Sequence, residues 1–296
     1  MKTIGLCLFG YNKNYDQSMS FEKYLSYFTI SIRAYKSLYI GWDIYLAVDS
    51  DSYSKFRELF DYFLYEKIID KLDVFDPSSI GKSTLWRFNP IKWSDYMISR
   101  DVDSLPTYRE RQCVEIWLNK DTLAHSINDN PVHSLSLLAG LVGFKKNSFN
   151  LDKLNELNID YTLKGGDQDF LNIYVYPLVK DSIVEHRIKG MPIRPENPYS
   201  YNNIEDIDVD VRLNLKEGED KKEVLLRTNK LINHMGQAGI RIFNHVDLAT
   251  GNFFEGAICF WSKYGDQKIH EKLLYIEKKY PNIFWTKNDI KNLCQK

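Results

Sequence analysis

The first hundred residues alternate between short apolar runs and longer amphipathic segments, which restricts the possible folds more than any other feature. Residues 4–10 form an apolar run that ends in glycine, which is typical of a buried strand. Residues 21–38 carry apolar side chains at helical spacing. By the same criteria we expect strands at 42–48, 71–75 and 94–99, and helices at 54–65 and 83–88. This alternation predicts an α/β protein with a mostly parallel, open sheet flanked by helices.

The second half of the chain is less regular. Helices are expected at 108–120, 170–176 and 268–279, and a small-residue strand or turn at 135–144. Residues 191–222 are rich in proline, asparagine and acidic residues, which is typical of a loop. We therefore expect a main domain at residues 1–190 and a C-terminal extension of mixed α+β character at 191–296, packed on the same domain.

Composition narrows the possible classes of protein. Of the 296 residues, 44% are hydrophobic and 27% are charged, which is a profile able to bury a sizeable core. The net charge of -1 gives no electrostatic signature of nucleic-acid binding. The apolar run at 4–9 is far too short to span a bilayer. The four cysteines are widely spaced and form no C-x-x-C pair, so we expect reduced thiols and a cytoplasmic location.

Asp101 and Asp103 end the strand expected at 94–99. On a continuing strand, residues two apart share a face, so the two carboxylates are expected side by side. They would repel each other unless a cation lay between them, and a divalent cation commonly carries a phosphate. Ligands of open α/β sheets bind at the carboxyl ends of strands, where Asp49 is also expected. Asp49 is interpreted either as a nucleotide contact or as a helix N-cap.

Three interpretations of the D-x-D pattern compete. It can be a solvated turn, the nucleophile motif of a haloacid-dehalogenase-like phosphohydrolase, or the metal site of a nucleotide-sugar glycosyltransferase. The phosphohydrolase motif normally belongs to the first strand, whereas about a third of this chain precedes Asp101. A separate match, Gly81-Lys82-Ser83-Thr84, resembles the end of a phosphate-binding P-loop. Asp76 stands where the full P-loop pattern requires glycine, so we do not expect a P-loop kinase.

Several blocks occur together in a fixed order. They are Trp86-Arg87-Phe88, Ser99-Arg100-Asp101-Val102-Asp103-Ser104, Arg109-Glu110, Trp117-Leu118, the segments 125–133 and 138–145, and Gly166-Asp167-Gln168-Asp169-Phe170-Leu171-Asn172. Over about residues 85–177 this order resembles a family of GT-A-fold, nucleotide-sugar glycosyltransferases. The last block also resembles the D-Q-D-x-L-N motif of glycogenin-like transferases. The chain departs from the pattern at Asn128 and Asn130, where the family often has Arg and His.

The resemblance implies a GT-A (Rossmann-like) fold and a metal-dependent transferase. Such an enzyme transfers a hexose-type sugar from a nucleotide-diphosphate donor, here expected to be a UDP-sugar, to a hydroxyl of a glycan or glycoconjugate. It implies Mn²⁺ or Mg²⁺ on Asp101 and Asp103, with His234 as a candidate third ligand. The expected donor-binding residues are Phe9, Tyr11, Asp49, Arg87, Arg100, Asp101, Gly140 and Gln168. Arg87 and Arg100 each have the alternative of pairing with a neighbouring carboxylate.

Asp167 and Asp169 are the expected catalytic residues. The resemblance implies that at least one of them contacts the sugar or acts as general base on the acceptor hydroxyl. Helix capping is the alternative, since both lie at the expected start of a helix. His133 is either a substrate contact or a surface histidine of a loop. A catalytically silent, glycan-binding relative is a further alternative for the whole chain.

Overall fold

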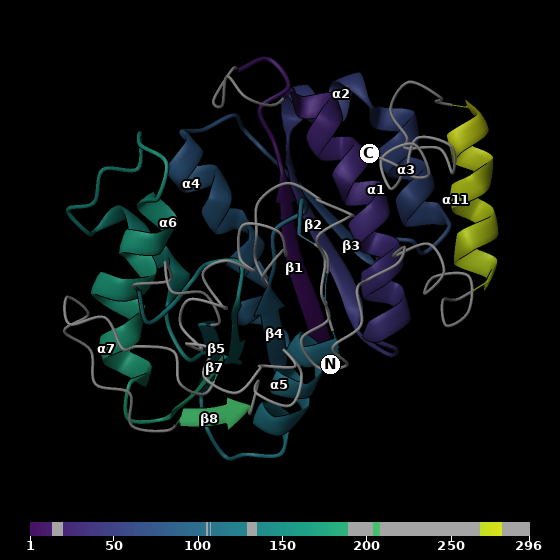
Figure 1. Ribbon diagram of the computed structural model, residues 1–296. Coiled ribbons are helices and arrows are strands. Elements are labelled where there is room, and N and C mark those ends of the chain that lie inside the picture. Colours follow the sequence, from purple (N-terminus) through teal and green to yellow (C-terminus); the bar gives the residue numbers. More distant parts are fainter. Residues whose placement is uncertain are drawn as a thin grey trace, which may run out of the picture.

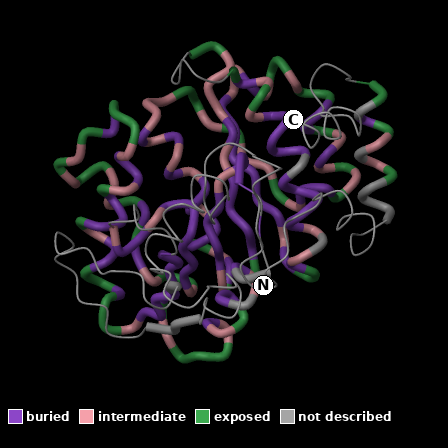
Figure 2. Tube along the Cα trace, in the orientation of Figure 1, coloured by how far each residue is buried: buried purple, intermediate pink, exposed green. Residues whose placement is uncertain are grey.

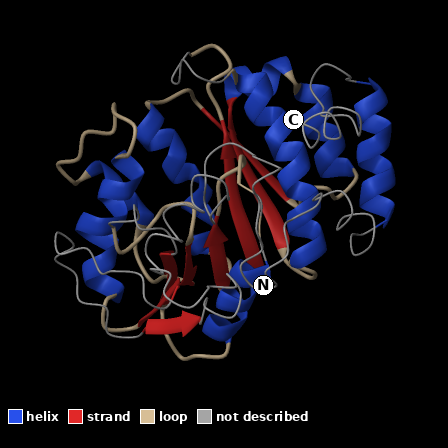
Figure 3. Ribbon diagram, viewed as in Figure 1, coloured by secondary structure: helices blue, strands red, loops and turns tan. Residues whose placement is uncertain are grey.

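The computed structural model describes residues 1–13, 20–104, 106, 108–128, 135–188, 204–207 and 267–279. An eight-stranded sheet lies at its centre, in the order β3-β2-β1-β4-β6-β5-β7-β8. In Figure 1, α1, α2, α3 and α11 lie to one side of β1, and α4, α6 and α7 lie to the other. Figure 3 shows the strands enclosed between these helices. The predicted α/β class, with an open sheet flanked by helices, is confirmed.

The sheet is mostly parallel, as predicted. Strands β1, β2, β3 and β4 run parallel, β6 is antiparallel to both β4 and β5, and β7 and β8 are parallel to β5. The bounds are β1 (Lys2–Leu8), β2 (Asp43–Asp49), β3 (Lys71–Phe75), β4 (Tyr96–Ser99), β5 (Ala124–Asn128), β6 (Val142–Lys145), β7 (Ile183–Ile188) and β8 (Ile204–Ile207). The parallel strands therefore deliver their carboxyl ends to one edge.

Most predicted helices are present with shifted bounds. The helices are α1 (Phe21–Leu38), α2 (Ser50–Lys55), α3 (Arg57–Tyr65), α4 (Ile80–Leu85), α5 (Tyr108–Leu118), α6 (Gly166–Asp169), α7 (Tyr176–Val179) and α11 (Gln267–Lys279). The 3-10 helices η1 (Trp86–Lys92) and η2 (Leu151–Asn155) and the π-helix η3 (Phe170–Val175) complete the set. The single helix expected at 54–65 was wrong, because α2 begins at Ser50 and a break at Phe56 separates it from α3.

The two larger apolar cores of the described residues lie on the two faces of the sheet. Ile98 of β4 joins the core under α1 and α3, whereas its neighbour Met97 joins the core under η1 and η3. This alternation follows from strand geometry, in which successive side chains point to opposite faces. Figure 2 shows the central strands almost entirely buried. Burial on both faces explains why β1 and β2 are nearly continuous apolar runs.

The C-terminal helix α11 packs on the first half of the chain. Lys272 Nζ lies 2.7 Å from Glu66 Oε2, and Tyr275 stacks on Tyr62 with ring centroids 6.0 Å apart. Strand β8 extends the main sheet beside β7. Most of the predicted extension at 191–296 lies outside the described residues, so the division into two parts stays a prediction.

Within the described ranges, no helix is both long and apolar enough to cross a membrane. Cys7, at the end of β1, has a free thiol.

Candidate functional site

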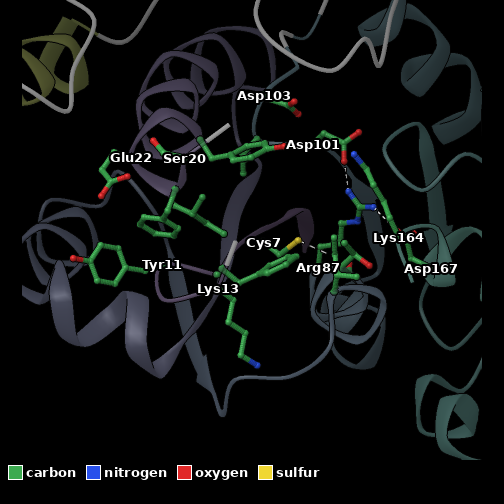
Figure 4. Close-up of a pocket in the computed structure, with 18 of the residues that line it drawn as sticks. Cys7, Tyr11, Lys13, Ser20, Glu22, Arg87, Asp101, Asp103, Lys164 and Asp167 are labelled. Carbon is green, nitrogen blue, oxygen red and sulfur yellow. Dashed lines mark hydrogen bonds and ion pairs between the residues drawn. The ribbon is translucent and has the colours of Figure 1, made fainter. Parts of the chain in front are cut away.

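A cavity of about 560 Å³ lies at the carboxyl ends of β1 and β4. Small-molecule sites typically enclose about 300–1,000 Å³. Its walls are formed by residues after β1, the start of α1, α4, the turn after β4 and the residues leading into α6 (Figure 4). Among the sequence-predicted residues, the lining includes Phe9, Tyr11, Arg87, Asp101, Asp103, Asp167 and Gln168. Three separate sequence motifs therefore meet at one place.

Arg87 joins two of the acidic motifs directly. Its Nη1 donates to Asp101 Oδ1, and its Nη2 donates to Asp167 Oδ2 at 2.5 Å (Figure 4). The side chains of Arg87 and Asp167 are only 6% and 7% exposed, against 35% for Asp101. Burial opposes the charge of Arg87, but the carboxylates of Asp101 and Asp167 outweigh it and raise the pKa of the guanidinium. Arg87 is thus a permanent cation held between two carboxylates.

Asp101 and Asp103 both line the cavity, but not as the sequence predicted. Strand β4 ends at Ser99, so the two aspartates lie in a turn rather than on one face of a strand. Helix α1 supports this turn, since Ser31 Oγ donates to the Val102 carbonyl at 2.9 Å. Asp103 is buried, and Asp101 is half-buried. Both residues line the same cavity, where the turn after β4 and not strand alternation places them.

Gly140 supports Asp101 instead of lining the cavity. A Cβ atom built on Gly140 would lie 2.0 Å from Asp101 Oδ2, so only glycine leaves room for this carboxylate. The neighbouring Ala139 accepts a hydrogen bond from Ser99 Oγ at 2.6 Å, which ties the segment to the end of β4. The predicted donor contact of Gly140 therefore becomes a packing contact in the described residues.

The D-Q-D-F-L-N motif spans α6 and the start of η3. Asp167 is buried in the cavity wall, and Gln168 lines the cavity while accepting the Ala139 amide at 3.2 Å. Asn172 exchanges two hydrogen bonds with the backbone of Leu137. Asp169 is exposed and is absent from the cavity lining, because it lies about 200° around the helix from Asp167. Only one of the two predicted catalytic aspartates thus reaches the cavity.

Arg100 takes the second of its two predicted roles. Its Nε donates to Glu110 Oε1 at 2.6 Å, and its Nη1 donates to the carbonyls of Ser99 and Val142. Glu110 also accepts the hydroxyl of Tyr39 at 2.8 Å. Arg100 and Glu110 are almost fully buried and do not line the cavity. The motif arginine beside Asp101 is therefore a structural cation, and Arg87 is the one at the site.

Asp49 is the N-cap of α2. Its Oδ1 accepts the Ser52 amide at 2.8 Å, and its Oδ2 accepts the Gly10 amide at 2.6 Å. Asp49 is buried and does not line the main cavity. Of its two predicted roles, the cap is the one that its contacts support. Through Gly10, it also fixes the segment that carries Phe9 and Tyr11.

The segment after β1 brings aromatic rings to the cavity. Tyr11 meets Phe21 and Phe56 edge to face, with centroids 5.9 Å and 5.5 Å away, and Phe9 meets Trp86 at 5.8 Å. Sequence patterns did not single out several other lining residues, namely Cys7, Lys13, Ser20, Glu22 and Lys164. Nothing in their local sequence marks them, because they converge only through the tertiary fold. Burial raises the pKa of the Cys7 thiol to about 12, so it is protonated at neutral pH.

The side chains of the cavity show whether the predicted divalent cation has suitable ligands. Within the described ranges, no three His, Cys, Asp or Glu side chains are grouped to hold a metal by themselves. Asp101 and Asp103 offer only carboxylate oxygens, the ligands that Mg²⁺ and Mn²⁺ accept. Mg²⁺ is commonly held by one or two carboxylates together with substrate phosphates and water. The pair therefore fits a cation that arrives with a phosphate. His133 and His234 lie outside the described residues.

The P-loop match has no phosphate-binding geometry. Gly81 to Thr84 lie within α4, and the Gly81 amide donates to the Tyr161 carbonyl at 3.0 Å. Lys82 Nζ contacts Asn155 Oδ1 at 3.3 Å, and neither residue lines the main cavity. The expectation that this is not a P-loop agrees with the structure.

Comparisons with known proteins give little beyond the fold. No family model and no curated protein sequence matches this chain. Among solved structures, a putative glucose-1-phosphate thymidylyltransferase from Bacillus anthracis matches at 14% identity and a TM-score of 0.38, over 63% of this chain and 86% of that one. A 4-diphosphocytidyl-2C-methyl-D-erythritol synthase from Anaerococcus prevotii matches at 9% identity and a TM-score of 0.39, over 78% of this chain and 96% of that one. Similarity this weak assigns no function.

Proposed function

We propose that this chain is a metal-dependent glycosyltransferase that uses a UDP-sugar donor. It would transfer a hexose-type sugar to a hydroxyl of a glycan or glycoconjugate. The observation that carries the proposal is the convergence of Arg87, Asp101 and Asp167 in one cavity, joined by two ion pairs. These residues come from three of the motifs that carry the family resemblance.

The contents of the cavity suit a nucleotide diphosphate sugar. The rings of Phe9 and Tyr11 offer surfaces on which a nucleobase can stack. Lys13, Arg87 and Lys164 bring positive charge to the same cavity, which favours a diphosphate. The opening at the carboxyl ends of parallel strands is where open α/β sheets bind nucleotides.

Asp101 and Asp103 would hold Mn²⁺ or Mg²⁺ against the diphosphate. When bound, the cation would stabilise the negative charge that develops on the leaving nucleoside diphosphate. Arg87 Nη2 donates to Asp167 Oδ2 at 2.5 Å and so fixes the direction of this carboxylate. Asp167 would then orient the sugar or accept the proton of the acceptor hydroxyl. Gln168, held by the Ala139 amide, is the neighbouring donor for a sugar hydroxyl.

The test is the release of UDP from a panel of UDP-sugars, with and without Mn²⁺. Asp101→Asn and Asp103→Asn should each lower the rate about a hundredfold or more, because each removes a ligand for the charge-stabilising cation. Asp152→Asn is the matched control, since Asp152 has a 75% exposed side chain that pairs with Lys92. Full activity in both site variants would reject the proposed metal site.

Two further measurements separate the alternatives. A haloacid-dehalogenase-like phosphohydrolase would form a covalent aspartyl adduct, which a beryllofluoride complex mimics. Binding of beryllofluoride at Asp101, together with no UDP binding, would favour the phosphohydrolase. UDP-sugar binding without turnover on any acceptor would instead favour a catalytically silent relative.

A further inference from the structure

Asp101 forms an ion pair with Arg87. Its Oδ1 accepts the Nη1 group of Arg87. Its Oδ2 faces Gly140 so closely that a Cβ atom there would stand 2.0 Å from it. One oxygen of the carboxylate is therefore ion-paired with Arg87, and the other packs against Gly140. A divalent cation that takes Asp101 as a ligand must displace Arg87 from this carboxylate or share the carboxylate with it.

Arg87 is held at the site by Asp167 and stays charged. It is buried, and its second branch stays bound to Asp167 at 2.5 Å. A divalent cation bound alone at Asp101 would thus stand beside a fixed guanidinium whose Nη1 had lost its acceptor. Like charges that close repel strongly in a poorly solvated site. A diphosphate bound with the cation removes both costs, because its oxygens accept from Nη1 and place negative charge between the two cations.

We propose that Arg87 is a positioning residue that occupies Asp101 until cation and nucleotide arrive together, which makes their binding cooperative. This inference depends on the proposed function, since it assigns Asp101 to a cation that accompanies a nucleotide diphosphate. Linkage makes the effect reciprocal, so UDP strengthens cation binding by the same factor by which the cation strengthens UDP binding. Asp167 contributes to this cooperativity because it holds Arg87 in place after the Arg87–Asp101 ion pair has broken.

The test measures Mn²⁺ binding to the protein without any turnover. Electron paramagnetic resonance of free Mn²⁺ gives the dissociation constant, first without and then with saturating UDP. In the wild-type protein, UDP should tighten Mn²⁺ binding by about tenfold or more, within the usual range of coupling between sites. In Arg87→Gln, Mn²⁺ alone should bind about tenfold more tightly than in wild type, and the further gain from UDP should shrink.

Arg57→Gln is the matched control for the loss of one positive charge. Arg57 is a 71% exposed arginine on α3 that pairs only at the surface with Asp61. This variant should leave the Mn²⁺ dissociation constant within about twofold of wild type, because exposed charges are screened by salt. Equal effects of Arg57→Gln and Arg87→Gln would overturn the inference, as would an Arg87→Gln affinity equal to wild type.

A second pair of variants decides the question even if Arg87→Gln fails to fold, which circular dichroism would reveal. Among the described residues, Asp167→Asn leaves Arg87 paired with the carboxylate of Asp101 alone, so Mn²⁺ alone should bind several-fold more weakly than in Asp169→Asn. Asp169 is two residues away, exposed and outside the cavity, so its change removes the same charge without altering Arg87. Equal Mn²⁺ affinity in these two variants would overturn the inference.

The proposed function and this inference fail in different ways. If Asp101→Asn leaves Mn²⁺ binding unchanged both with and without UDP, the metal site itself is wrong and both ideas fall. If Mn²⁺ binding requires Asp101 but UDP and Arg87→Gln leave its affinity unaltered, only the inference about Arg87 falls.

Discussion

Gly5 of β1 lies directly against the backbone of Arg87: a Cβ atom on Gly5 would stand 1.9 Å from the Arg87 carbonyl oxygen. The same atom would lie 3.6 Å from the ring of Pro90, so η1 rests on the bare strand at this point. Glycine inside a strand often marks such a close approach of another backbone. The position of Arg87 between its two carboxylates therefore depends on residue 5 of β1 being glycine, which has no side chain.

Gly5→Ala should destabilise the protein by about 1–3 kcal/mol, the usual cost of inserting a methyl group into a packed interior. It should also displace Arg87 and so lower UDP-sugar turnover. Urea denaturation measures the free energy of unfolding. Gly41→Ala is the comparison, because nothing lies within 4 Å of its Cβ position and only its φ of +79° is strained. A loss of stability no larger than that of Gly41→Ala would contradict the close approach at Gly5.

Arg100 and Glu110 should behave as a buried pair that tolerates joint replacement better than single loss. Glu110→Gln leaves the buried Arg100 charge uncompensated and should cost about 3–5 kcal/mol in unfolding free energy. The double change Arg100→Met with Glu110→Leu should recover much of that loss, since no buried charge remains. Denaturation of Arg100→Met, of Glu110→Leu and of the double variant gives the coupling energy. Additive losses would show that the pair acts independently.

The apolar strands of the sheet were predictable from the sequence, but a buried strand with polar side chains was not. Strands β1, β2 and β3 were predicted because they carry apolar runs or alternation. Strand β5 reads Ala-His-Ser-Ile-Asn, and its residues are all buried despite three polar side chains. The ring of His125 packs between other elements, on Trp117 of α5 and against His186 of β7. Local propensity cannot detect a strand whose polar side chains are buried by tertiary packing.

The candidate site shows the same division between local and long-range information. Local sequence could not decide which of Arg87 and Arg100 lies in the cavity. The outcome depends on their partners in the fold, because Arg100 pairs with buried Glu110 and Arg87 pairs with Asp167 in the cavity wall. The choice between Asp167 and Asp169 could have been made, because residues two apart on a helix point about 200° apart. The sequence predicted a helix there, so it already contained the reason why only one aspartate faces the cavity.

Cys7 should resist alkylation although it lines the cavity. Burial raises the pKa of its thiol to about 12, and the nearby carboxylates of Asp101 and Asp167 add to this, against the opposing effect of Arg87. The thiolate is the reactive form, so at pH 8 the folded protein should label with iodoacetamide far more slowly than the unfolded chain. Mass spectrometry of the Cys7 peptide measures the rate. Labelling as fast as in urea would contradict a protonated, shielded thiol.

His125 should make the fold sensitive to mild acid. Burial, His186 and Arg100 lower its pKa well below 6.5, and neither ring nitrogen has a hydrogen-bond partner among the described residues. The unfolded chain therefore takes up a proton as the pH falls below about 6.5 while the folded protein does not, so stability present above that pH is lost below it.

The measurement for His125 is the free energy of unfolding between pH 7.5 and 5. Each such group contributes a slope of up to about 1.4 kcal/mol per pH unit. His125→Phe keeps a ring to stack on Trp117, whose centroid lies 4.7 Å away, and should reduce the slope. A slope unchanged by this substitution would assign the acid sensitivity to other groups.

Asp167 and Asp169 give the sharpest test of the site, because they share charge, helix and sequence motif but not position. Asp167 is buried against Arg87 in the cavity wall, whereas Asp169 is exposed outside it. Under the proposed function, Asp167→Asn should lower kcat/KM for UDP-sugar turnover by about a hundredfold or more, because it removes the carboxylate assigned there to the sugar or the acceptor hydroxyl. Asp169→Asn should change it by less than about threefold, as expected for a surface carboxylate. An equal loss of kcat/KM in the two variants would support a catalytic role for both aspartates, as the motif alone predicts. Wild-type kcat/KM in both variants would show that neither aspartate takes part in the reaction.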